Sequence, residues 1–229
     1  MRIAFKILFF LVSFNVFSQE IAPVSPFQEI DSLYREDQFY FGITYNQFNK
    51  VPAGFSQNGI STGINFGFLR DMPINKKRTY AIAIGLGLSY NKWHNNLKTT
   101  QNFGITTYEI VDKNSFSRNK TEQVFVDLPV ELRWRNSTPE SHKFWRIYTG
   151  FKLRYLIFDK SIYNSSETVK VTKNSDFNQI QYGPYIAFGF NTWNLTAYYG
   201  LKPVYKSAKT AGESLEMKTL NIGLIFYIL

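Results

Sequence analysis

The sequence predicts an all-β protein, an eight-stranded antiparallel up-and-down transmembrane β-barrel. Eight segments alternate between apolar and polar residues, their connections alternate between short and long, and their apolar faces carry Trp and Tyr at both ends. Aromatic residues make up 18% of the 229 residues, which argues against disorder. The sequence contains no cysteine, which excludes a disulfide scaffold and a thiolate metal site.

The first residues have the features of a secretory signal peptide. Basic residues precede an apolar run, ILFFLVSFNVF, and Val16 and Ser18 occupy the −3 and −1 positions of a cleavage site. This run has about half the length of a membrane-spanning helix, and no later run approaches that length. We therefore expect a signal peptide at 1–18, a short periplasmic leader at 19–37 and an outer-membrane barrel at 38–229.

The predicted strands follow one another with connections of two kinds. The second, fourth and sixth connections are short and rich in turn residues, whereas the others are longer. Outer-membrane barrels sort their connections in this way, with short turns in the periplasm and long loops outside, but Greek-key sandwiches do not. The predicted strands are 38–48, 59–71, 79–93, 121–135, 144–158, 178–191, 193–206 and 217–229.

Each predicted strand has two different faces. In the first two strands one row of alternate residues is apolar, and in the third strand Ile and Leu alternate with Ala and Gly. The fourth and fifth alternate apolar with charged residues, the sixth and eighth keep an uncharged apolar row, and the seventh has Lys202 and Lys206 on its polar face. A soluble barrel with its apolar face inside would show the same alternation, so the positions of the aromatic residues decide between the two.

Trp and Tyr gather at both ends of the apolar faces, as they do at the two interfaces of a membrane. Tyr80 and Tyr90 are ten residues apart, as are Trp145 and Tyr155. Each pair spans about 33 Å along its strand, or about 25 Å at a tilt of about 40°, which is the height of the apolar band in such barrels. The expected rings are Tyr80, Trp134, Trp145 and Trp193 at the short turns, and Tyr90, Tyr155, Tyr182 and Tyr205 at the long loops.

The opposite faces of the fourth and fifth strands carry charges into the lumen. Eight strands make a barrel just wide enough to be filled by side chains. Isolated buried charges are costly, so we expect Asp127 and Glu131 to pair with Lys152 and Arg154 across a short turn. The expected lumen charge network, a plug rather than a conducting pore, is Asp127, Glu131, Arg133, Lys152 and Arg154.

The fourth to sixth strands resemble the PorT-type outer-membrane barrel proteins. The stretch VFVDLPVELRW, with Asp127, Pro129, Arg133 and Trp134, is similar to one strand of that family, and YTGFKLRYL and GPYIAFGF are similar to the next two. The resemblance implies an outer-membrane protein whose best-known relatives serve type IX secretion. Pro129 also removes a ladder hydrogen bond, so we expect a bulge there.

Candidate catalytic residues are sparse. His94 is near Ser89, Asp112, Ser115 and Ser117, and a His–Ser–acid set at the rim would suit a lipid A or phospholipid hydrolase. No phosphate-binding glycine loop or metal-ligand spacing occurs, so we expect no cofactor and no metal. The favoured function is a non-enzymatic accessory or assembly component of secretion, and the alternative is a stand-alone structural barrel or surface adhesin.

The expected partners follow from the location. An exported chain of net charge +9 does not meet nucleic acid, which leaves outer-membrane lipid and lipopolysaccharide as anionic partners. The barrel-assembly machinery would insert the chain, and a larger secretion complex would bind it. The longest loop, 94–120, is the expected contact surface.

Overall fold

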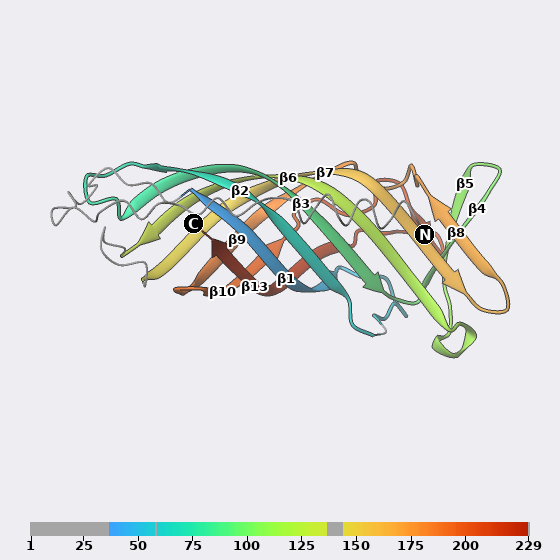
Figure 1. The fold of residues 1–229 in the computed structure, drawn as a ribbon. Helices are drawn as coiled ribbons and strands as arrows, with labels where there is room; N and C mark the ends of the chain where they lie inside the picture. The colour runs from blue at the N-terminus through green and yellow to red at the C-terminus, as the bar shows by residue number, and fades with distance from the viewer. Residues whose placement is uncertain (1–36, 58, 137–143, 229) are drawn as a thin grey trace, which may run out of the picture. The chain divides into compact units, whose positions relative to one another are not determined.

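The computed structural model describes residues 37–57, 59–136 and 144–228. Eight antiparallel strands follow one another around a closed barrel, and the last pairs with the first (Figure 1), which confirms the predicted fold class. They are β1 (Gln38–Asn49), β2 (Thr62–Pro73), β3 (Tyr80–His94), β6 (Arg118–Arg135), β7 (Trp145–Asn164), β9 (Ile180–Phe190), β10 (Trp193–Tyr199) and β13 (Lys218–Ile228). The expected signal peptide lies outside the described residues.

The shorter elements belong to the long connections. β4 and β5 form a hairpin between β3 and β6, and β8 pairs antiparallel with the end of β7 (Figure 1). These elements are β4 (Leu97–Asn102), β5 (Ile105–Ile110), the 3₁₀ turn η1 (Lys113–Ser115), β8 (Thr168–Thr172), β11 (Lys209–Thr210) and β12 (Glu213–Ser214). No helix among the described residues is long and apolar enough to cross a membrane.

The pairing registers determine the tilt of the strands. From Tyr80, the line of directly opposite residues passes through Trp134, Ile147, Phe188, Leu195, Leu224, Ile43 and Ile64 and returns to β3 at Tyr90. One circuit of the barrel therefore advances the register by ten residues. Ten residues cover about 33 Å along a strand, and eight interstrand steps cover about 38 Å, so the strands tilt by about 40°.

This geometry places the outward-facing aromatic residues at two heights. One residue along a strand rises about 2.5 Å along the barrel axis, and one step to the next strand rises about 3 Å. Trp134 and Trp145 then lie within about 3 Å of the height of Tyr80, and Trp193 lies about 8 Å above it. The outer ring, about 25 Å above Tyr80, comprises Tyr45, Tyr90, Tyr155 and Tyr182.

Tyr205 does not belong to the outer ring. β10 ends at Tyr199 rather than near residue 206, and the chain then turns inward. Tyr205 is only 6% exposed and stacks on Phe177, with ring centroids 4.9 Å apart. The expectation for Tyr205 is therefore wrong, because the alternating pattern continues in residues that fold over the barrel end.

Pro129 lies in a straight part of β6, so the expected bulge is not there. The bulge between β6 and β7 is at Val124 and Phe125 instead. On the other side of β6, the ladder with β3 has no pairs at Leu128 and Pro129, although the register is the same before and after the gap. A local interruption of the ladder is sufficient to accommodate a residue without an N–H group.

An apolar cluster, here called the cap, covers the long-loop end of the barrel. The cap joins barrel strands to the connecting segments. Phe48 and Trp93 of the barrel strands stack on each other, with ring centroids 5.0 Å apart. The Tyr108 hydroxyl donates to Asp176 Oδ2 at 3.1 Å, and burial raises the pKa of this phenol. The buried members of the cap are Phe48, Trp93, Leu97, Tyr108, Phe177, Val204, Tyr205, Ala208, Leu215 and Met217.

Candidate functional site

The lumen of the barrel holds the largest concentration of buried charge among the described residues. Because side chains alternate along a strand, β6 directs every second residue from Asp127 to Arg135 inward, and β7 does the same from Arg146 to Arg154. All five members of the expected lumen charge network point inward. They form two groups at different heights.

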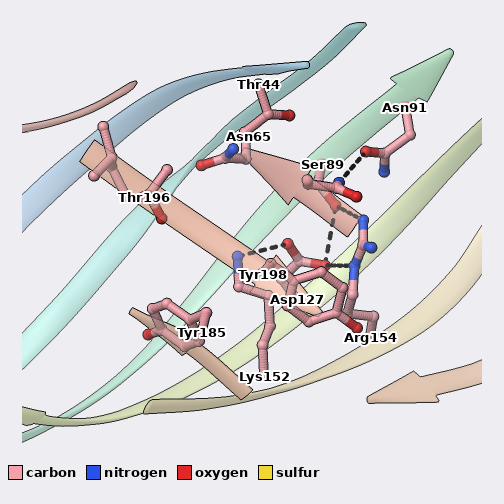
Figure 2. A pocket seen from close by; sticks show the side chains of 12 residues that line it. Thr44, Asn65, Ser89, Asn91, Asp127, Lys152, Arg154, Tyr185, Thr196 and Tyr198 are labelled. Carbon is pink, nitrogen blue, oxygen red and sulfur yellow. Dashed lines mark hydrogen bonds and ion pairs between the residues drawn. The ribbon is translucent and has the colours of Figure 1, made fainter. Parts of the chain in front are cut away.

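The first group surrounds Asp127, whose side chain is fully buried (Figure 2). Asp127 Oδ1 accepts hydrogen bonds from Arg154 Nε at 3.2 Å and from Ser89 Oγ at 3.0 Å. Arg154 Nη2 donates to Ser89 Oγ at 2.9 Å, and Lys152 Nζ lies 3.7 Å from Asp127 Oδ2. The Asp127 carboxylate thus interacts with two cations, Arg154 and Lys152. Arg154 reaches it because the two residues are directly opposite each other in the register of β6 and β7.

The second group lies nearer the short turns and surrounds Arg133. Asp71 of β2 accepts from Arg133 Nη1 at 2.9 Å and from Arg135 Nη1 and Nη2 at 2.9 and 2.8 Å. Glu131 accepts from Arg133 Nε at 2.7 Å and from the Tyr185 hydroxyl at 2.6 Å. Buried ion pairs therefore link β2 to β6, and the Tyr185 hydroxyl adds a hydrogen bond from β9.

The expected pairing of Glu131 with Lys152 or Arg154 is wrong. Glu131 is directly opposite Gly150, which offers no side chain, and Lys152 and Arg154 lie nearer Asp127. Arg133 is two residues along β6, so its side chain points in the same direction as that of Glu131. Glu131 therefore pairs with Arg133 of its own strand, which lies closer to it than the cations of β7.

Aromatic rings pack against the remaining surfaces of the cations. The guanidinium carbon of Arg154 lies 4.1 Å from the centre of the Phe125 ring. Arg146 has no ion-pair partner among the described residues, and its Nε and Nη1 atoms donate no hydrogen bond to any of them. Its guanidinium carbon lies 4.6 Å from the centre of the Phe144 ring, which offers a cation–π contact in place of an acid.

The space left inside the lumen is small. A cavity of about 30 Å³ lies beside the Asp127 group, with room for about two water molecules (Figure 2). Nearer the long loops, Asn91 Oδ1 accepts hydrogen bonds from Asn46 Nδ2 and Asn221 Nδ2, each at 3.0 Å. The described side chains therefore fill the lumen at both of these heights.

The residues considered for a hydrolase do not form a catalytic set. Ser89 is buried in the lumen and bonded to the Asp127 group. Ser115 Oγ donates to the backbone oxygen of Asp112 at 2.7 Å, within a turn. His94 and Ser117 line the same surface pocket, but no hydrogen bond joins the His94 imidazole to a serine or an acid of the described chain.

The expected network lacks three lumen charges, Asp71, Arg135 and Arg146. Arg135 and Arg146 share the lumen-facing parity of their strands, so the alternation does place them inward, although the expected network leaves them out. Asp71 is the one charged residue in the lumen-facing row of β2, and the pairing of β2 with β3 and of β3 with β6 brings it to Arg133 and Arg135. No pattern within β2 reveals that contact.

Comparison with known proteins agrees with this architecture. A family model described as an outer membrane protein beta-barrel domain matches residues 17–206. No curated protein matches the chain. Because the match covers most of the sequence and the barrel is closed by eight tilted strands between two aromatic rings, the chain belongs to the outer membrane protein beta-barrel domain family.

Proposed function

We propose that this barrel is a non-enzymatic accessory or assembly component of protein secretion at the outer membrane, of the PorT type that serves type IX secretion. The filled lumen supports a role other than transport through the barrel, since the cavity at the Asp127 group holds only about two water molecules. The function would then lie at the long-loop end, which we place outside the cell.

The observation that carries the proposal is the tip of the β4–β5 hairpin. Phe103 is fully exposed there, and Ile105 beside it is 69% exposed. Phe103 also has a positive φ of 49°, a conformation that bulky residues rarely adopt. An exposed aromatic residue on a strained turn is unfavourable for the isolated barrel, which suggests that it is kept for binding.

The hairpin presents this tip rigidly. Its six residue pairs are in register, and the Thr100 and Thr107 hydroxyls are hydrogen-bonded at 2.7 Å. Leu97 and Tyr108 at its base are buried in the cap. No residue from 99 to 108 is charged, so the tip suits an apolar socket on a partner protein, where one buried aromatic anchor can dominate affinity.

Photocrosslinking in living cells tests this function. Benzoylphenylalanine in place of Phe103 should give a discrete adduct with a larger outer-membrane protein, identified by mass spectrometry, whereas the same residue in place of Tyr80 should give lipid adducts. Phe103→Ser combined with Ile105→Ser should lower the amount of secreted protein while leaving the folded barrel intact. A Phe103 adduct limited to lipid or host surface molecules, with normal secretion, would favour the structural barrel or adhesin.

A further inference from the structure

We infer that the outer side of β1, β2, β3 and β6 carries a binding site for a phosphorylated, multiply acylated glycolipid of the lipid A class. The site combines an apolar groove between the aromatic rings with a basic pocket above the outer ring. The inference shares one premise with the proposed function, namely that the long-loop end faces outward, and is otherwise independent of it.

The apolar groove has a volume of about 620 Å³ and lies on the outer wall of the barrel. Gly67 and Gly87, directly opposite each other on β2 and β3, form part of its floor. A Cβ atom on either glycine would collide with the Tyr40 hydroxyl, so both positions require glycine. The walls of the groove include Phe39, Phe41, Phe66, Phe68, Leu86 and Leu88.

The pairing registers place this groove within the hydrocarbon of the membrane. Phe39 lies about 9 Å above Tyr80, Leu86 about 15 Å and Leu88 about 20 Å. The surface is continuous with the lipid-facing wall of the barrel, and a hollow at this depth is filled by acyl chains. Its volume exceeds the roughly 300 Å³ at which ligand pockets begin.

The basic pocket lies higher, where the end of β3 meets η1 and the start of β6. It has a volume of about 600 Å³, and His94, Lys113, Phe116 and Arg118 contribute to its lining. His94 is directly opposite Lys120 in the register of β3 and β6. Arg and Lys side chains at the rim of a pocket are the groups that bind phosphate oxygens.

Positive charge prevails around this pocket. Lys92, Lys120 and Arg118 act on His94, which lies beyond the outer ring, and burial together with these charges lowers the pKa of its imidazole. Glu122 Oε1 forms an ion pair with Lys120 Nζ at 2.5 Å and accepts a hydrogen bond from the Tyr90 hydroxyl at 2.9 Å.

The remaining acid nearby is also occupied. Asp112 Oδ1 accepts from the backbone N–H of Asn114 at 2.8 Å and caps η1. Lys92, Lys113, Arg118 and Lys120 thus face two acids that have local partners. Lys113 and Arg118 have no ion-pair partner among the described residues, so the pocket keeps an excess of positive charge. A doubly charged phosphate monoester complements this excess.

The vertical order of the groups favours a glycolipid over a phospholipid. Along β3, the outward row passes from Leu86 and Leu88 through Tyr90 to Lys92 and His94. Lys92 lies about 5 Å and His94 about 10 Å above the outer ring, whereas the phosphate of a phospholipid lies at the ring itself. A phosphate carried on a sugar, with acyl chains below, spans this distance.

Binding measurements on the purified, detergent-solubilised barrel test the inference. Diphosphoryl lipid A should bind at least tenfold more tightly than its dephosphorylated form and than phosphatidylglycerol, by native mass spectrometry. Lys113→Gln combined with Arg118→Gln should lose at least tenfold in affinity, and Leu86→Trp, which fills the groove, should do the same. The matched controls are Lys209→Gln, an exposed cation elsewhere, and Leu195→Trp on the opposite wall, and both should bind as the wild type does.

Equal affinity for phosphatidylglycerol and diphosphoryl lipid A would overturn the inference, because it would leave only general lipid contact. Unchanged affinity in the Lys113 and Arg118 double variant would overturn it as well. Neither result bears on the Phe103 adduct, so this test and that of the proposed function can fail separately.

Discussion

Replacing Asp127 by Asn should destabilise the barrel strongly, because it removes the one carboxylate that serves Arg154 and Lys152. Both oxygens of Asp127 are fully buried, at 3.2 Å from Arg154 Nε and 3.7 Å from Lys152 Nζ. Removing one partner of a buried ion pair typically costs about 3–5 kcal/mol. The free energy of unfolding, measured by urea titration of the barrel in lipid vesicles, should fall by about this amount.

A double-mutant cycle separates the ion pair from other effects of the substitution. Arg154→Met should also destabilise, and the combined variant should lose clearly less than the sum of the two, because no unpaired partner then remains. Glu109→Gln, in an exposed ion pair with Lys98 at 3.8 Å, is the control and should cost about 1 kcal/mol or less. A loss for Asp127→Asn no larger than that of Glu109→Gln, or strict additivity with Arg154→Met, would refute the reasoning.

Three further predictions concern the pore, the lipid face and the topology. The purified barrel should show no steady ion current in planar bilayers, because paired side chains fill the lumen, and large stable channels would contradict this. Leu86→Arg places a charge near the middle of the membrane and should cost about 2–4 kcal/mol in vesicles, whereas Phe103→Arg at the hairpin tip should cost almost nothing; equal stability of the two would show that the lipid face is misassigned. Cysteine at Phe103 should react with an impermeant thiol reagent on whole cells and cysteine at Asn75 should not, and equal labelling would reverse the orientation.

The strands and their faces could be predicted because both depend on local patterns. Side chains alternate with a period of two whatever the partner strand, so the lipid-facing row of β3 and the lumen-facing row of β6 follow from the sequence alone. The two aromatic rings follow in the same way, since Tyr80 and Tyr90 mark both ends of one strand. The pattern fails at Tyr205, where alternation continues in a segment that has left the barrel wall and packs in the cap.

The contacts inside the lumen depend on the registers at which neighbouring strands pair, and no single strand contains that information. Asp71 and Arg133 belong to β2 and β6, which are not neighbours, and they meet across β3 only because each pairing step shifts the height by a fixed amount. A slip of two residues in any one pairing would keep every side chain on its correct face. Such a slip between β2 and β3, or between β3 and β6, would separate Asp71 from Arg133.

The closing register therefore links the packed interior to the outer surface of the barrel. A circuit of ten residues brings Tyr90 to the height at which Tyr45 and Tyr155 lie, and two of its pairings, β2–β3 and β3–β6, align Asp71 with Arg133 and Arg135 inside. The buried ion pairs oppose a register slip, because a slip would leave Arg133 and Arg135 without Asp71 in a water-poor lumen. Through the register, the lumen charges hold the lipid-facing rows, the groove and the basic pocket at their heights in the membrane.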